Sequence, residues 1–93
     1  FYLYILKSSK DGRIYIGRTS DLRERFKEHK NGEVSSTKYR RPLTLVYYES
    51  YRSLEDTKER ERKLKQFKNS YAELKKRIIR SLEVVGGQEA LPI

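Results

Sequence analysis

An Asp11-Gly12 dipeptide separates two short segments, residues 1–7 and 13–18, that are rich in aromatic, aliphatic and β-branched side chains. Asp-Gly between two segments of this kind is a strong local signal for a β-hairpin, because glycine readily adopts the backbone conformation that a tight turn needs. We therefore expect the chain to fold around an antiparallel pair of strands near its start.

The register of this hairpin decides whether its two central tyrosines meet. Tyr15 and Gly17 share one face of the second strand, and the glycine leaves room for a phosphate to approach. In one register the loop has four residues and Lys7 lies opposite Gly12. Tyr4 then lies opposite Tyr15, and both hydroxyl groups project from one face. A slip by one residue would separate them.

A helix is expected over residues 22–30. Asp21 can accept a hydrogen bond at the start of this helix, and Glu24 follows three residues later, as in a capping box. The segment contains no helix breaker, and Asn31-Gly32 supplies a left-handed stop after it. The first helix therefore directly follows the hairpin.

A third strand is expected over residues 43–51, after a polar and basic loop at residues 33–42 that ends in proline. The segment is rich in residues that favour strands, and its side chains alternate with a period of two. One expected face holds Leu43, Leu45 and Tyr47, and the other holds Thr44, Val46 and Tyr48.

Two more helices are expected, with a break near Asn69 between them. Ser53 begins a second capping box ahead of residues 54–67. Ser70 and Glu73 form a third capping box ahead of apolar residues at helical spacing, which are Tyr71, Leu74, Ile78 and Leu82.

The resulting order, β-β-α-β-α-α, indicates a mixed α/β (α+β) domain in which helices flank a small sheet. A chain of 93 residues fits one such domain. We assign residues 1–85 to it. Residues 86–93 contain two glycines, a proline and no periodicity, so we expect a flexible C-terminal tail there.

The balance of charge favours a polyanionic partner. Lysine and arginine number 22 against 13 aspartate and glutamate residues, for a formal net charge of +9. Nucleic acid is the leading candidate, and a basic domain without such a partner is the alternative. No apolar run approaches the roughly 20 residues that cross a bilayer. We therefore expect a cytoplasmic protein with no membrane partner.

The usage of cysteine and histidine limits the metal chemistry. Cysteine is absent and there is one histidine, which excludes disulfides and Cys/His zinc sites. A metal would need oxygen ligands, for which Mg²⁺ or Mn²⁺ is suited. The chain also lacks methionine, so we expect that Phe1 is not the residue at which translation starts.

Two basic residues lie on or beside the apolar stripe of the first helix. Leu22, Arg25, Phe26 and His29 recur at steps of three and four residues. A cation at the edge of a core must find an anion or line a cleft. Alternatively, Arg25 extends to solvent while His29 only interacts with the dipole at the end of the helix.

The second long helix carries an inward-facing carboxylate. Glu61 falls on one face with Leu54, Thr57 and Leu64, whereas Glu59 falls on the opposite face. A structural ion pair between Glu61 and Arg25 is one explanation. The other is a site for phosphodiester hydrolysis, in which a single carboxylate holds Mg²⁺ and an arginine stabilises the negative charge.

Several short motifs extend this pattern over residues 2–67. They are Tyr2-Leu3-Tyr4, Tyr15-Ile16-Gly17, Arg25 and His29 at ten and fourteen residues after Tyr15, Glu61 before Arg62-Lys63-Leu64, and the stretches 38–42 and 45–49. In this order the sequence resembles the GIY-YIG nuclease family, with Tyr2-Leu3-Tyr4 in place of Gly-Ile-Tyr. The resemblance is to its small standalone members and the N-terminal nuclease domain of the excision-repair protein UvrC.

The resemblance implies a three-stranded antiparallel sheet flanked by helices and Mg²⁺-dependent cleavage of DNA. By it, Glu61 holds the metal and Arg25 contacts the cleaved phosphate. Tyr4 and Tyr15 position or activate the attacking water, and His29 assists. Either a tyrosine or His29 is the general base: the family motif favours Tyr15, whereas an ordinary pKa near 6.5 favours His29.

We therefore expect a small DNA endonuclease that is structure-selective or weakly sequence-specific, in DNA repair or recombination. The residues expected to bind backbone phosphates are Arg18, Lys38, Arg40 and Arg41. One alternative is a DNA- or RNA-binding module without catalysis on the same scaffold. Another is a structural protein whose basic surface is incidental.

Overall fold

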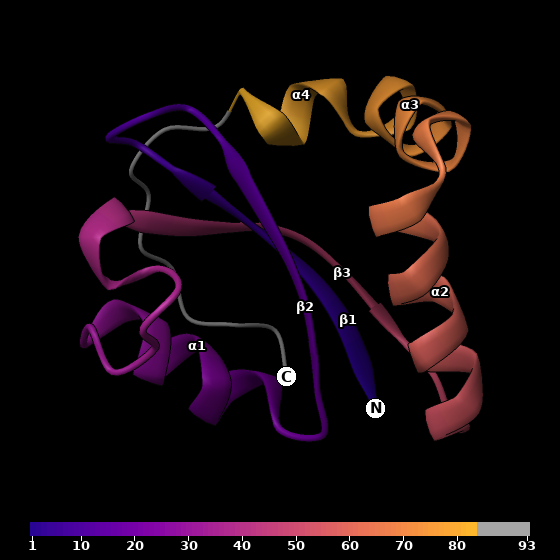
Figure 1. The fold of residues 1–93 in the computed structure, drawn as a ribbon, viewed down its shortest axis with the longest axis horizontal. Coiled ribbons are helices and arrows are strands. Elements are labelled where there is room, and N and C mark those ends of the chain that lie inside the picture. The colour runs from indigo at the N-terminus through magenta and orange to yellow at the C-terminus, as the bar shows by residue number, and fades with distance from the viewer. Residues whose placement is uncertain (84–93) are drawn as a thin grey trace.

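The computed structural model describes residues 1–83. The predicted tail at residues 86–93 lies outside this range. The elements, shown in Figure 1, are β1 (Tyr2–Ser8), β2 (Ile14–Thr19), α1 (Leu22–Lys30), the 3-10 helix η1 (Lys38–Arg40), β3 (Leu43–Ser50), α2 (Leu54–Gln66), α3 (Lys68–Arg77) and α4 (Ile79–Leu82).

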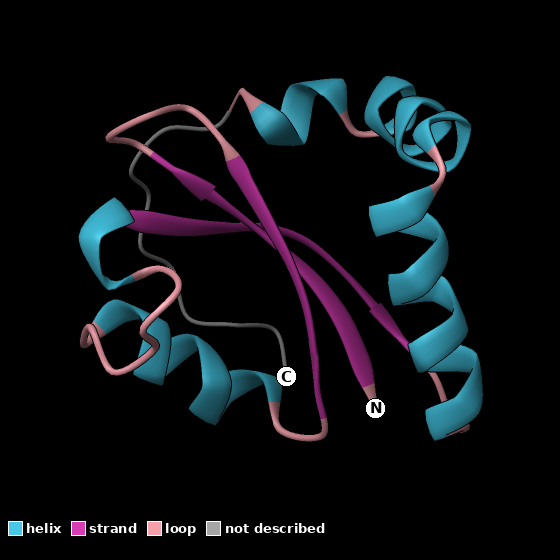
Figure 2. Ribbon diagram, in the orientation of Figure 1, coloured by secondary structure: helices cyan, strands magenta, loops and turns pink. Residues whose placement is uncertain are grey.

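The three strands form one antiparallel sheet in the order β2-β1-β3, with helices around it (Figure 2). The predicted fold class, a mixed α/β domain with a small antiparallel sheet, is confirmed. No helix in residues 1–83 is both long and apolar enough to cross a membrane.

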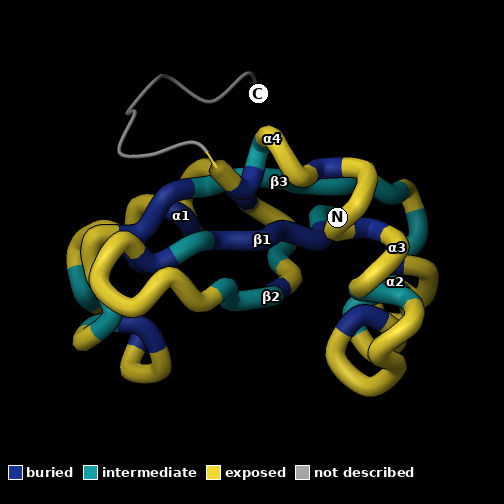
Figure 3. Tube along the Cα trace, turned by 90° about the horizontal axis from the view of Figure 1, so that it is seen from above, coloured by how far each residue is buried: buried dark blue, intermediate teal, exposed yellow. Residues whose placement is uncertain are grey.

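The central strand β1 has apolar residues on both of its faces. Leu3 and Ile5 pack in one cluster with residues of α2, α3 and α4, whereas Tyr4 and Leu6 pack in a second cluster with α1. All four side chains are buried, and β1 lies in the middle of the molecule (Figure 3). The sheet therefore has two distinct faces, one toward α1 and one toward α2, α3 and α4.

The hairpin register differs from the predicted one by two residues. Tyr4 pairs with Gly17, and Leu6 pairs with Tyr15. The loop does have four residues, but they are residues 9–12, because the Ser8 N–H bonds the Arg13 carbonyl at 2.9 Å. A shift by two preserves the side-chain face, so both tyrosines still project from one side of the sheet.

The side chain of Ser8 explains where this loop begins. Its Oγ accepts hydrogen bonds from the backbone N–H groups of Lys10 and Asp11, at 3.1 and 3.2 Å. Gly12, with φ of 72°, is the last residue of the loop and does not pair with Lys7. The Asp-Gly signal thus marked the turn correctly, while a serine before it set the register.

A bulge in β3 interrupts the predicted alternation of its side chains. Ile5 pairs with Tyr47 and Leu6 pairs with Leu45, so the intervening Val46 has no partner of its own. Val46 and Tyr47 both pack on the face of α2, α3 and α4. The prediction that Tyr47 shares a face with Leu45 is therefore wrong, because an extra residue in one strand reverses the order of faces beyond it.

The predicted start of α1 and that of α2 are confirmed. Asp21 Oδ1 accepts the Glu24 N–H at 3.1 Å, and Ser53 Oγ accepts the Asp56 N–H at 3.3 Å. Each bond satisfies a backbone donor that the first helical turn leaves without a partner.

The predicted third capping box is wrong. Ser70 lies inside α3, and the helix break is at Phe67, whose extended backbone has φ of −113° and ψ of 112°. α3 begins directly after this residue, before the serine can act as a cap. A second interruption at Ile78 separates α3 from α4.

A charged and hydrogen-bonded group fixes the end of β3 to α2. Arg60 donates to both carboxylate oxygens of Glu49, at 3.0 and 3.1 Å from Nε, and the hydroxyls of Tyr47 and Tyr51 also donate to Glu49. Burial alone would raise the pKa of Glu49, but these hydrogen bonds outweigh it and hold the pKa below its ordinary value of 4.5.

Replacing this carboxylate by an amide is expected to destabilise the fold. Glu49→Gln leaves Arg60 without its anion, which should cost about 1–3 kcal/mol of unfolding free energy near pH 7. Because the folded pKa is the lower one, the contribution is present above the unfolded pKa and is lost as the pH falls through the folded pKa. Urea unfolding at pH 7 and at about pH 3 measures both effects.

Glu55→Gln is the matched control, because Glu55 is an exposed α2 carboxylate that pairs with Lys58 at 3.8 Å. Its substitution should change the unfolding free energy by less than about 0.5 kcal/mol. Equal effects of the two substitutions would contradict the structural role of Glu49.

Candidate active site

Tyr4 lies at the centre of the candidate site. Its side chain is buried on the α1 face of the sheet, and its hydroxyl forms a hydrogen bond of 2.8 Å with His29 Nε2. Its partner across the strands is Gly17, where an added Cβ would stand only 2.6 Å from both Cζ and Oη of Tyr4. The absence of a side chain at position 17 therefore allows the phenol ring to lie across β2.

His29 is buried and bonded at both ring nitrogens. Nε2 bonds Tyr4, and Nδ1 lies 2.7 Å from Thr37 Oγ1. Burial, followed by the charge of Arg25, lowers the pKa of His29 from 6.5 to about 4. The imidazole is therefore neutral near pH 7, and it cannot simply act as a surface charge at the helix end.

Sequence reasoning missed Thr37, which lies just before η1 and is fully buried. Its segment has no periodicity that would indicate a buried side chain. A threonine within a polar, basic loop gives no local signal, since only the approach of the loop to α1 makes it a partner of His29. Its hydroxyl fixes the orientation of the imidazole ring.

Tyr15 completes an aromatic group around His29. Its ring centroid lies 6.3 Å from that of Tyr4 and 5.1 Å from the imidazole. Tyr15 is only partly buried, whereas Tyr4 has 1% of its surface exposed. The edge strand thus places one tyrosine nearer to solvent and the central strand keeps the other inside.

Arg25 lies one helical turn before His29 on α1. Its Nη1 donates to Glu28 Oε1 at 2.9 Å, and hydrogen bonds with Glu28 and then Tyr4 raise the pKa of Arg25. For Tyr4, burial raises the pKa to about 12, although the hydrogen bond with Arg25 opposes this rise. The phenol is therefore protonated near pH 7.

Glu61 approaches the same region from the other face of the sheet. It is partly buried, with 20% of its side chain exposed, and Thr57 and Leu64 on the same side of α2 are buried. Burial is the main cause of the raised pKa of Tyr4, and the negative charge of Glu61 is the smallest contribution to it. The edge strand β2 is the element that both groups approach.

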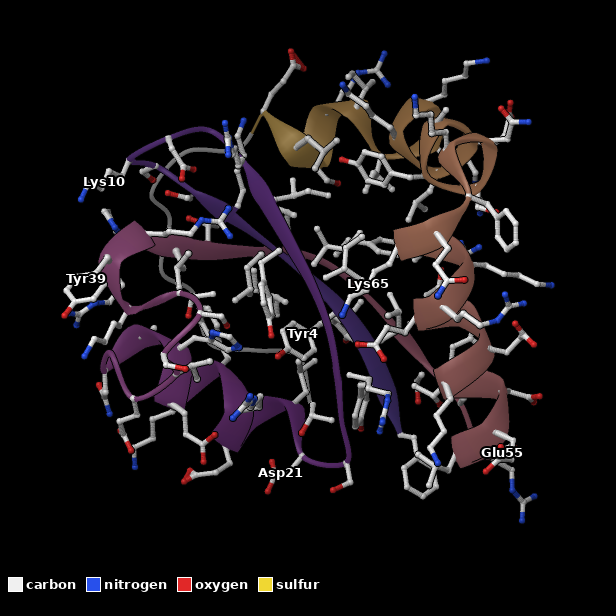
Figure 4. All side chains as sticks on the ribbon, in the orientation of Figure 1. Tyr4, Lys10, Asp21, Tyr39, Glu55 and Lys65 are labelled. Atoms are coloured by element: carbon white, nitrogen blue, oxygen red, sulfur yellow. The ribbon has the colours of Figure 1, made fainter. Side chains whose placement is uncertain are left out.

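Two cations neutralise Glu61. Arg18 Nε bonds Oε1 and Lys65 Nζ bonds Oε2, each at 3.0 Å. Figure 4 shows Lys65 extending from α2 toward the middle of the sheet, where Tyr4 lies. The predicted alternative, an ion pair between Glu61 and Arg25, is wrong, because α1 and α2 lie on opposite faces and Arg25 pairs with Glu28.

The donor chemistry at Glu61 fits a hard divalent cation that keeps most of its water. Residues 1–83 contain no group of three or more His, Cys, Asp or Glu side chains that could enclose a metal. Mg²⁺ is commonly bound through one or two carboxylates together with water and substrate phosphate. A metal at Glu61 would have to displace Arg18 or Lys65 from the carboxylate.

The four predicted phosphate-binding residues differ in their surroundings. Arg18 bonds Glu61, and Arg40 bonds Asp11 and the Ile14 carbonyl. Lys38 and Arg41 line an open cavity of about 680 Å³ that also includes other basic side chains and Tyr39. The structure thus places Lys38 and Arg41 at a basic surface, whereas Arg18 and Arg40 are engaged with carboxylates.

The buried, neutral His29 is expected to control how stability depends on pH. The unfolded chain takes up a proton on this imidazole near pH 6.5, whereas the folded state does so only near pH 4. Unfolding free energy should therefore fall as the pH decreases between these values. Because the chain has one histidine, NMR titration of the imidazole measures the folded pKa directly.

His29→Gln should remove this pH dependence between about pH 6.5 and 4, which urea unfolding can test. An imidazole that titrates above pH 6 in the folded protein would contradict its neutral, hydrogen-bonded state.

Gly17→Ala is expected to disturb Tyr4, because the added methyl group would overlap its ring and hydroxyl. Overpacking of this kind costs about 1–3 kcal/mol of unfolding free energy. The cost should largely disappear in a Tyr4→Ala background, where the ring is gone. A double-mutant cycle by urea unfolding measures this coupling, and purely additive effects would contradict the contact.

Comparison with known proteins identifies the family of this chain. The family model of the GIY-YIG catalytic domain matches residues 1–77. A UPF0213 protein of Staphylococcus saprophyticus is 40% identical over 67 residues, which cover 71% of this chain and 80% of the relative. A UPF0213 protein of Staphylococcus aureus is 37% identical over the same shares of the two chains. No solved structure gives a significant match. The match over residues 1–77, together with these relatives, shows that this chain belongs to the GIY-YIG catalytic domain family, whose members are endonucleases.

Proposed function

We propose that this protein is a divalent-metal-dependent endonuclease that hydrolyses phosphodiester bonds in DNA. One observation carries most of the proposal: Tyr4 is bonded to a neutral imidazole and lies across a glycine, beside Arg25 and within the electrostatic range of Glu61. Packing of the Tyr4 ring alone does not require a hydrogen-bonded imidazole, a guanidinium and a carboxylate around it.

Glu61 is the residue that we propose to hold the metal, with Mg²⁺ or Mn²⁺ as the ion. A bound ion of this kind supplies positive charge to a phosphate and lowers the pKa of its water. Arg18 and Lys65, which pair with this carboxylate, would then turn to phosphate oxygens. Both cations are partly exposed, so this exchange requires only side-chain rotation.

Arg25 is proposed to bind the cleaved phosphate. Its guanidinium is partly exposed, lies next to the Tyr4 hydroxyl and can form two parallel hydrogen bonds to phosphate oxygens. Its present partner Glu28 is also partly exposed, so a phosphate can compete for the guanidinium. Its hydrogen bonds would be stronger to the transition state, where negative charge develops on the phosphate oxygens, than to the bound substrate. They would therefore lower the activation barrier more than they strengthen substrate binding.

For the attack of water on phosphorus, we propose that Tyr4 accepts the proton from water while its own proton passes to His29 Nε2. The ester bond between phosphorus and the leaving oxygen breaks, and that oxygen takes a proton from solvent. The hydrogen bond of 2.8 Å provides this path, and a phenol with a pKa of about 12 needs such an acceptor near pH 7. His29 is fully buried, which prevents direct contact with bulk water. It therefore acts through Tyr4, and Thr37 positions it.

Tyr15 is proposed to orient the water and the phosphate from the edge strand, since it is more exposed than Tyr4 and its ring lies near both Tyr4 and His29. The open basic cavity with Lys38 and Arg41 would bind the DNA backbone farther along. So small a domain supports structure-selective or weakly sequence-specific cleavage. Repair or recombination of DNA in the cytoplasm is the setting that we propose.

Glu61→Gln is expected to abolish Mg²⁺-dependent cleavage, with a loss of roughly 100-fold or more, because the amide cannot supply the metal with a negative ligand. The assay uses linear, flapped and branched DNA with and without Mg²⁺. Glu59→Gln is the matched control, since Glu59 is an α2 carboxylate that pairs with Arg62 at the exposed surface.

Equal cleavage by the Glu61→Gln and Glu59→Gln proteins would overturn the assignment. Salt-sensitive binding of DNA without any cleavage would instead support a non-catalytic nucleic-acid-binding module. The neutralisation of Glu61 by two cations is the observation that favours this second function.

A further inference from the structure

A second cavity, of about 820 Å³, adjoins the proposed active site between the edge strand and the helices. Tyr15 of β2 and Lys65 of α2 both line it, and Lys65 is the lysine that bonds Glu61. A ligand held at the proposed catalytic centre can therefore continue into this cavity. Its volume is within the range of about 300–1,000 Å³ that is typical of ligand sites.

The walls of the cavity are largely apolar and aromatic. Ile14 and Ile16 line it from β2, while Phe67 and Tyr71 line it from the junction of α2 and α3. Phe67, the extended residue at the helix break, is 50% exposed. An exposed phenylalanine beside an apolar wall offers a flat surface on which a planar ring can stack.

The charged side chains that line these walls are all positive, and one of them, Lys65, is paired with Glu61. Lys65, Lys68 and Lys75 line the cavity, and Arg62 lies over the Phe67 ring at 5.4 Å. Among residues 1–83, no carboxylate lines it. Aromatic rings combined with lysines are the features of surfaces that bind single-stranded nucleic acid, where bases stack and cations hold the phosphates. An apolar peptide would account for the rings but not for three lysines.

We propose that this cavity binds an unpaired nucleotide next to the phosphodiester that is cleaved, with its base stacked on Phe67. This inference rests on the proposed function and names its substrate class. A base within an intact duplex is stacked on its neighbours and cannot enter such a cavity without being extruded. The substrate is therefore DNA with unpaired nucleotides at the cleavage point, such as a flap or a single-stranded stretch.

The test measures stacking directly, without cleavage. A 12-nucleotide single-stranded DNA with one 2-aminopurine is titrated with the protein at low salt in the absence of divalent metal. Wild-type protein should quench the 2-aminopurine fluorescence. Phe67→Ala should weaken binding about 5- to 100-fold, the range that loss of one stacked base produces. Phe67→Trp should restore it. Binding of an intact 12-base-pair duplex should change less than twofold in either variant.

Ile79→Ala is the matched control, because Ile79 on α4 is another large, exposed apolar residue and does not line the cavity. Circular dichroism would show whether each variant is folded. Absence of quenching by the wild-type protein would overturn the proposal. Equal losses for single-stranded and duplex DNA in Phe67→Ala would also overturn it.

The outcome is distinguishable from failure of the proposed function. If stacking depends on Phe67 but no DNA is cleaved in a Glu61-dependent manner, the cavity is a binding site and the endonuclease proposal fails. If DNA is cleaved and Phe67→Ala cuts flapped and linear duplex DNA as the wild type does, the endonuclease proposal stands and the inference about the cavity fails.

Discussion

The contact of Tyr4 with Gly17 and His29 joins the parts of this domain on which the candidate site depends. The phenol ring comes from β1, the glycine beneath it from β2 and the imidazole from α1. Thr37, which bonds the far side of the imidazole, ties the segment before η1 to the same group. A side chain at position 17 would push the ring away. The position of the Tyr4 ring therefore depends on glycine at position 17, which has no Cβ, as well as on the hydrogen bond to His29.

The sheet separates the charged groups of the site, because they lie on helices that cover its two opposite faces. α1 places Arg25 and His29 on one face, whereas α2 places Glu61 on the other. The carboxylate and the guanidinium therefore do not neutralise each other. Arg25 pairs with Glu28 within α1, whereas Glu61 pairs with Lys65 within α2 and with Arg18 of β2. In the proposed reaction, a phosphate and its metal would satisfy both charges at once, which is the physical reason to propose a function for the arrangement.

Local sequence signals predicted the elements well but not how they are aligned. Asp21 and Ser53 cap their helices as expected, because a capping bond involves only neighbouring residues. The hairpin register was wrong by two residues because Ser8 captures two backbone N–H groups of the loop. The bulge at Val46 had no local signal at all. The alternation of side chains still placed Tyr4 and Tyr15 on one face, because a register shift of two residues preserves the face. It gave the wrong face for Tyr47, which lies beyond the bulge.

By itself the sequence determined the order of elements, the family and the basic charge. It also determined the helical faces that carry Arg25, His29 and Glu61, because spacing along one helix fixes which residues share a side. Tertiary structure alone decided that Thr37 orients the imidazole, that Arg18 pairs with Glu61, and that the exposed Phe67 lies beside the site. Most of these contacts join elements that are far apart in the chain. Their formation depends on register and packing across the sheet, which no local pattern encodes.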